Sequence, residues 1–108
     1  MSISGIFDLR PIVTSYLQPE LHLTDEEVAH WSPIEAVPSA ATQFEIVVGH
    51  AETPPFHQQA QDYGFVLGRH GVSAERVTMP GEDHMSVLRK MGIKGTPMWE
   101  RLAEIIAR

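Results

Sequence analysis

Apolar residues along this chain alternate between short runs typical of buried strands and longer stretches with helical spacing. The clearest run covers residues 43–48 and ends in three consecutive β-branched residues, and a second run covers residues 75–79. Residues 2–7 have the pattern of the end of another strand, with a turn permitted at Gly5. Because helical stretches separate these runs, their order predicts an α/β fold with about three parallel strands and flanking helices.

Signals for helix starts and ends divide the segments between the strands. The sequence Thr24-Asp25-Glu26-Glu27 is a capping box, so it predicts a short helix that ends at Ser32-Pro33. Thr53-Pro54 predicts the start of a longer helix, which ends at His70-Gly71. A third helix is expected over residues 84–91, directly after the second apolar run.

Two more helices are predicted near the ends of the chain. Asp8 is placed to cap a helical stretch that stops at Pro19, and Thr96-Pro97 begins the last helix. The first stretch carries one apolar stripe, made of Leu9, Ile12, Val13, Tyr16 and Leu17. The last helix is expected to turn four apolar residues inward, Met98, Leu102, Ile105 and Ile106.

Composition limits the classes of function. With 108 residues, 43% of them hydrophobic and 20% charged, the chain suits one globular domain. Its net charge is −6 and its eight Lys and Arg residues are scattered, which argues against nucleic-acid binding. The absence of Cys excludes disulfides, thiolate catalysis and Cys-based zinc sites, and it fits a reducing cytoplasm. We expect no signal peptide and no membrane span, because no leader-like or long apolar segment occurs.

Glu52 and His84 are the candidates for chemistry. Each comes just after the carboxyl end of a predicted parallel strand, which is the edge where open α/β sheets place their sites. A carboxylate there can accept a hydrogen bond from the imidazole and fix its tautomer, so that the other ring nitrogen faces a nucleophile. The alternative interpretation is structural, with Glu52 as a solvated loop residue and His84 at a helix cap.

Three segments of the chain resemble the α/β-hydrolase superfamily, and in particular the kynurenine formamidase (arylformamidase) family and its bacterial esterase relatives. They are Ser4-Gly5-Ile6-Phe7-Asp8-Leu9-Arg10-Pro11, the acid-loop segment Gly49-His50-Ala51-Glu52-Thr53-Pro54-Pro55-Phe56-His57-Gln58-Gln59, and the histidine loop Pro80-Gly81-Glu82-Asp83-His84. The resemblance implies that residues 1–108 are a single partial α/β-hydrolase domain, the C-terminal segment that carries strands six to eight. It also implies hydrolysis of a small-molecule ester or aryl formamide without a cofactor, with Glu52 as catalytic acid and His84 as base.

The chain departs from this family where the nucleophile should be. It contains no G-x-S-x-G elbow and no His-Gly-Gly stretch for an oxyanion hole. Ser4 lies in the Ser-Gly segment and not on an elbow, and Ser86 is too close to His84 along its helix to serve as its nucleophile. We therefore expect a truncated sheet with a bare edge at its first strand, and catalysis only when a Ser-bearing N-terminal half completes the chain. Alone, the chain is expected to self-associate or to pair with such a half.

Other interpretations remain open. One is a non-catalytic interaction module that pairs through the exposed sheet edge. Another is a metal-binding domain built on His50, Glu52 and His57, although their spacing fits neither a zinc finger nor H-E-x-x-H. Tyr16 and Trp31 belong to a region that in the family helps to cover the active site, but packing of the local core is the preferred interpretation. The remaining histidines are His22, His30 and His70, and they are expected to be solvated.

Overall fold

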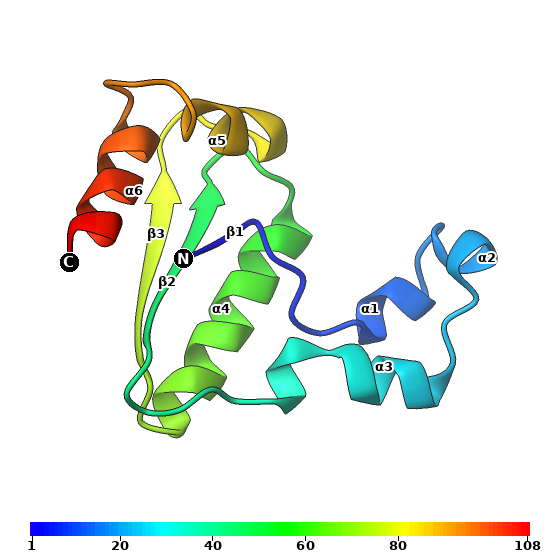
Figure 1. Cartoon of the computed structure of the whole chain (residues 1–108). Coiled ribbons are helices and arrows are strands. Elements are labelled where there is room, and N and C mark those ends of the chain that lie inside the picture. Colours follow the sequence, from blue (N-terminus) through cyan, green and yellow to red (C-terminus); the bar gives the residue numbers. More distant parts are fainter.

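The central strand of the sheet is β2, Gln43–Gly49, and it lies between β1, Ser2–Ile3, and β3, Ser73–Met79. Both neighbours run parallel to it in the computed structural model, which describes residues 1–108 (Figure 1). The pairing of β2 with β3 runs from Gln43 opposite Ser73 to Gly49 opposite Met79, whereas β1 pairs only through its two residues. The predicted α/β class with three parallel strands and flanking helices is therefore confirmed.

Helices cover both faces of this sheet, because the apolar residues of β2 alternate between the two sides. Ile46 and Val48 pack against α4, Pro54–Arg69, in one core cluster. Val47 points to the opposite face and joins a second cluster. That second cluster is completed by Met79, Val87 and Met98, from β3, α5 (His84–Lys90) and α6 (Pro97–Ala107). The result is three layers, α4 on one side of the sheet and α5 with α6 on the other. The carboxyl ends of the parallel strands lie together at one rim of the sheet.

The helix starts follow the capping signals in the sequence. The capping box of α3, Asp25–Trp31, is formed as predicted, with the Thr24 side chain accepting from Glu27 N and the Glu27 side chain accepting from Thr24 N. Thr96 caps α6, and Thr53 takes the extended N-cap conformation before α4. Pro33–Glu35 forms a 3₁₀ turn, η1, in the connection after α3.

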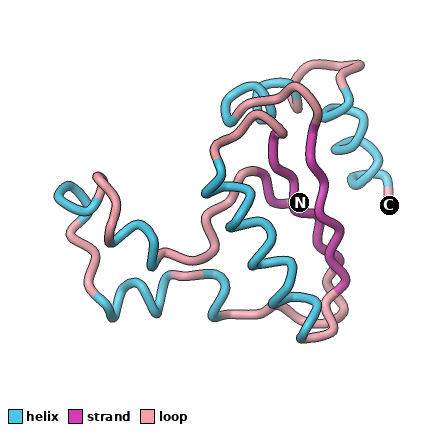
Figure 2. Tube along the Cα trace, turned by 180° about the vertical axis from the view of Figure 1, so that it is seen from behind, coloured by secondary structure: helices cyan, strands magenta, loops and turns pink.

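The prediction of one helical stretch between Asp8 and Pro19 is wrong. The segment forms two separate turns of helix, α1 at Arg10–Val13 and α2 at Gln18–Leu21, and Pro19 lies in the first turn of α2. Hydroxyl groups end α1, because Thr14 Oγ1 donates to the Pro11 carbonyl and Ser15 Oγ donates to the Ile12 carbonyl. Together α1, α2 and α3 extend away from the sheet, as seen from behind in Figure 2.

Three apolar side chains expected in the core lie in solvent instead. Tyr16 is 87% exposed and Trp31 is 66% exposed, because the α1–α3 segment extends beyond the cover of the sheet layers. Ile106 is 75% exposed, since α6 turns only part of its apolar surface toward the sheet. No helix of the chain combines the length and the apolarity needed to cross a membrane.

The first strand is also shorter than the predicted stretch of residues 2–7. Ser4 ends the pairing because it adopts a φ of 50°, in the left-handed region, although its amide still donates to the Val47 carbonyl at 2.8 Å. The chain then turns across α4, where Phe7 is buried and its ring stacks on Tyr63 with centroids 4.1 Å apart.

Candidate functional site

The Glu52 carboxylate lies in the loop after β2, and its side chain is fully buried. Its Oε1 lies 2.7 Å from Nδ1 of His84. Its Oε2 accepts two further hydrogen bonds, each 2.6 Å long, from the Ser4 hydroxyl and from the Gly49 amide. Three donors from three segments of the chain therefore converge on one buried carboxylate, which satisfies the requirement that a buried charge be hydrogen-bonded.

Opposing effects act on the pKa of Glu52. Burial raises that pKa, whereas the hydrogen bonds from Ser4, Gly49 and His84, in that order, lower it. The hydrogen bonds prevail, so that the pKa lies below its ordinary value and the group is ionised at neutral pH. An ionised carboxylate can only accept hydrogen bonds, so Nδ1 of His84 must carry the shared proton.

His84 is the first residue of α5, where the backbone turns from the β3 loop into the helix. The Asp83 carboxylate fixes this turn by accepting from the amides of Met85 and Ser86, at 2.9 and 2.7 Å. The ring of Phe56 stacks on the imidazole, with centroids 4.4 Å apart. His84 is half exposed, and its Nε2 makes no hydrogen bond within the chain. A basic nitrogen is thus presented to the outside while its partner nitrogen is anchored inside.

The loops after β2 and β3 are joined through the backbone. The amide of His50 donates to the Met79 carbonyl at 2.9 Å, and the amide of Ala51 donates to the Glu82 carbonyl at 3.0 Å. Glu82 itself is buried and accepts from Lys90 Nζ at 2.6 Å, and this hydrogen bond holds the pKa of Glu82 below its ordinary value. These contacts fix the distance between the two loops that carry Glu52 and His84.

Neither serine near the site is free to act as a nucleophile for His84. The Ser4 hydroxyl is bonded to Glu52 on the oxygen that does not face the imidazole. Ser86 belongs to the capping box of α5, where its Oγ accepts from the Asp83 amide at 2.9 Å.

The three residues considered as metal ligands do not converge. Glu52 is occupied by its three donors, and His57 Nε2 lies 3.2 Å from the backbone carbonyl of His50. No group of three or more His, Cys, Asp or Glu side chains is arranged to hold a metal ion.

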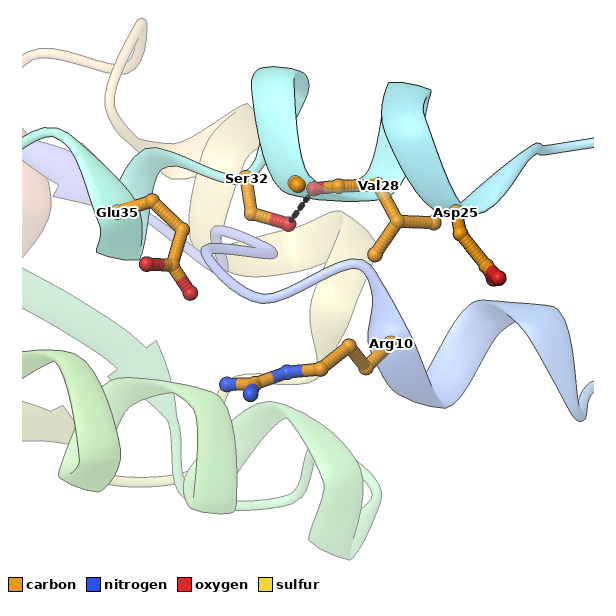
Figure 3. A pocket seen from close by; sticks show the side chains of 6 residues that line it. Arg10, Asp25, Val28, Ser32 and Glu35 are labelled. Atoms are coloured by element: carbon orange, nitrogen blue, oxygen red, sulfur yellow. Dashed lines mark hydrogen bonds between the residues drawn. The ribbon is translucent and has the colours of Figure 1, made fainter.

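A hollow of about 260 Å³ lies elsewhere, between α1 and α3 (Figure 3). Its lining includes Arg10, Asp25 and Glu35 together with Val28 and Ser32, whose hydroxyl donates to the Val28 carbonyl at 2.6 Å. Arg10 is paired with Asp8 at 2.7 Å. The hollow shares no lining residue with the Glu52–His84 pair, so it belongs to the local packing of the N-terminal helices.

Three contributors to the site were not assigned a role from sequence. Ser4 lies far from Glu52 along the chain, and nothing in its own segment signals the hydrogen bond. Gly49 stands one turn before Glu52, and its close approach to the next loop depends on the tertiary structure. Phe56 lies in the first turn of α4, and its stacking on His84 of α5 joins two segments that are distant in the sequence, so no local signal predicts it.

The fold and this geometry define the class: an α/β protein with a carboxylate–imidazole pair at the carboxyl ends of its parallel strands. No protein-family model matches the chain. The chain is similar to the kynurenine formamidase of Salmo salar, with 30% identity over 95 residues that cover 82% of this chain and 32% of that protein. It is also similar to the kynurenine formamidase of Danio rerio, with 28% identity over 94 residues and the same coverage. The similarity supports a relationship to formamide-hydrolysing enzymes. The chain spans about a third of the length of these curated relatives.

Proposed function

We propose that this chain is the C-terminal segment of an α/β-hydrolase fold and carries the acid and the base of a Ser-Glu-His triad. The observation that supports the proposal is the contact of 2.7 Å between a buried carboxylate and a half-exposed imidazole, Glu52 and His84. Similarity to two kynurenine formamidases supports an aryl formamide or an ester as the substrate. The segment that supplies the serine and the oxyanion hole is absent from these 108 residues.

In the proposed reaction, a serine hydroxyl from the missing half attacks the carbonyl carbon of the substrate. Nε2 of His84 accepts the serine proton and then delivers it to the leaving amine or alcohol. Glu52 holds the tautomer that leaves Nε2 basic, and its charge stabilises the imidazolium that forms. A water molecule then attacks the acyl-enzyme, and Nε2 of His84 accepts a proton from that water. The same nitrogen returns the proton to the serine oxygen as the carboxylic acid is released. No cofactor takes part in these steps.

The outer edge of β1 is the proposed contact with the Ser-bearing half. The Ser4 amide donates to β2. Because the backbone groups of successive residues in a strand point to opposite sides, the amide and carbonyl of Ile3 point away from β2. No further strand pairs with that edge. A strand from the missing half would satisfy these groups, and a second copy of this chain is the alternative occupant.

A chimera tests the proposed function directly. The third of the salmon enzyme that aligns with this chain is replaced by residues 1–108, so that the remaining two thirds supply the rest of the fold. We expect the chimera to hydrolyse an aryl formamide or a p-nitrophenyl ester, and we expect the 108-residue chain alone to be inactive. Hydrolysis by the chain alone would contradict the proposed division of the triad.

Two variants of the chimera identify the responsible groups. His84→Ala removes the proposed base and should abolish turnover. His70→Ala is the matched control, because His70 lies exposed at the C-terminal end of α4 and its side chain hydrogen-bonds only to the Val66 carbonyl. Two results would overturn the proposal. One is a folded but inactive chimera that carries no further substitution, and the other is a chimera whose activity survives His84→Ala.

A further inference from the structure

The Ser4 hydroxyl is the least expected of the three donors to Glu52. It donates to Oε2 across 2.6 Å from the end of β1, so it comes from a different segment than the acid loop and the histidine loop. Oε2 also accepts from the Gly49 amide, while Oε1 faces His84. With one oxygen held by two donors, the carboxylate cannot rotate without breaking both bonds, so the direction of Oε1 toward the imidazole is fixed.

The backbone at Ser4 carries strain that its hydrogen bonds maintain. A φ of 50° is unfavourable for a residue with a Cβ, and of the other non-glycine residues only His22 adopts a positive φ. The Ser4 amide is tied to the Val47 carbonyl at 2.8 Å. Gly5 follows in close packing, since a Cβ there would lie 2.5 Å from the Phe7 ring. Strained residues that the surroundings hold in place are a feature of functional sites.

We propose that Ser4 is a positioning residue: its hydroxyl fixes the Glu52 carboxylate in the plane that orients His84. The catalytic consequence rests on the proposed function, whereas the hydrogen-bond geometry does not. Ser4 therefore acts on the reaction only through Glu52, and it neither contacts the substrate nor carries a proton in any step.

Two substitutions separate the hydroxyl from the backbone. Ser4→Ala removes the hydroxyl and keeps a Cβ in the left-handed conformation, whereas Ser4→Gly removes the hydroxyl and relieves the strain. If the Ser4 hydroxyl positions Glu52, both variants lose the fixed orientation of the Glu52 carboxylate to the same extent. The glycine variant is nevertheless the more stable of the two. Ser73→Ala is the matched control, because Ser73 is exposed at the start of β3 and makes no side-chain hydrogen bond.

The first readout is made on the 108-residue chain and needs no catalysis. Carbon-13 NMR of the side-chain carboxyls follows the pKa of Glu52, which the Ser4 hydroxyl helps to hold below its ordinary value. We expect that pKa to rise in both Ser4 variants and to stay unchanged in Ser73→Ala. We also expect the low-field Nδ1 proton of His84 to shift or broaden in both, because the acceptor becomes mobile.

The second readout is kinetic. In the chimera, both Ser4 variants should lower kcat by about ten- to hundredfold while KM stays nearly constant, as expected for a misplaced catalytic group. An unchanged Glu52 titration in either variant, or full kcat in the glycine variant, would overturn the positioning role and leave the proposed function intact. A shifted Glu52 titration in the Ser4 variants of the 108-residue chain, together with a chimera that never turns over, would support the positioning role and count against the proposed function.

Discussion

The Cα of Gly49 packs against the carbonyl group of Glu82, and a Cβ built on the glycine would lie 2.4 Å from that oxygen. Gly49 ends β2 and donates its amide to Glu52, and Glu82 lies in the loop that leads to His84. This contact sets the separation of the two loops that form the site. The loops can approach this closely only because residue 49 has no side chain.

Gly49→Ala should therefore destabilise the fold and disturb the site together. The added methyl must displace the Glu82 backbone, at a cost of about 1–3 kcal/mol in the free energy of unfolding, as for other overpacked positions. Urea unfolding measures this loss, and the Nδ1 proton signal of His84 reports the disturbed contact with Glu52. Gly68→Ala is the matched control, because nothing lies within 4 Å of its added Cβ. That variant lies within α4 and should be more stable by about 0.5–1 kcal/mol. If Gly49→Ala and wild type had the same free energy of unfolding, the two loops would be able to move apart without cost.

Glu52→Gln should invert the tautomer of His84 without unfolding the chain. The one carbonyl oxygen of glutamine is needed by the two donors on the Oε2 side, Ser4 and Gly49. The glutamine NH₂ group then faces Nδ1, which must accept, so the ring proton moves to Nε2. Nitrogen-15 NMR distinguishes the two tautomers directly. In the chimera, loss of the basic Nε2 should lower kcat on the order of 10⁴-fold, the scale for a wrong tautomer in a serine-hydrolase triad. A ring that keeps its proton on Nδ1 in the variant would contradict this account.

Local signals in the sequence were sufficient for most of the fold. The β-branched run of β2 and the capping residues Thr24 and Thr96 are local signals that act within a few residues, so the strand and the helix starts form where the sequence predicts them. The prediction of one N-terminal helix is wrong because the spacing of apolar residues does not show where side-chain hydroxyls interrupt a helix. Hydroxyl–backbone bonds at Thr14 and Ser15 interrupt the stripe, and a proline that ends one helix is equally suited to begin the next.

The site was predictable only in part. Two residues that each follow a strand of a parallel sheet must meet at one rim, and this rule brought Glu52 and His84 together from sequence. Ser4 also donates to the Glu52 carboxylate, because it follows the end of β1 and adopts a left-handed backbone conformation. Neither feature produces a local pattern in the sequence. The exposure of Tyr16 and Trp31 likewise depends on where the α1–α3 segment lies, which spacing alone does not determine.

The pair of Lys90 and Glu82 should make stability depend on pH in acid. The Lys90 hydrogen bond keeps the pKa of Glu82 below its ordinary value of 4.5. A carboxyl with a lowered pKa in the folded state stabilises the fold above the unfolded pKa and loses that effect as the pH falls through the folded pKa. Lys90→Met should therefore reduce the free energy of unfolding at pH 7, and the difference from wild type should shrink below about pH 4.5.

The matched control for this pair is Lys94→Met, because Lys94 lies exposed in the turn after α5 and forms no ion pair. Urea unfolding at pH 7 and pH 3 measures both variants against wild type. A Lys90→Met deficit that is the same at both values of pH would show that the lysine acts through packing of its stem and not through the charge on Glu82.

The open edge of β1 leads to the last prediction. The amide and carbonyl of Ile3 face outward with no strand beside them, and paired backbone groups contribute about 0.5–1.5 kcal/mol per hydrogen bond. In the absence of the Ser-bearing half, we expect a second copy of the chain to pair along this edge, so that the sedimenting mass increases with concentration. Ile3→Pro removes the outward amide and leaves the bonds of Ser2 and Ser4 to β2 in place, and it should shift the equilibrium toward monomer. Ile3→Val is the matched control, since it keeps the amide and most of the apolar contact with the second core cluster. If wild type stays monomeric across the micromolar range, or if both variants weaken association equally, the contact lies elsewhere and β1 is not the edge that a partner completes.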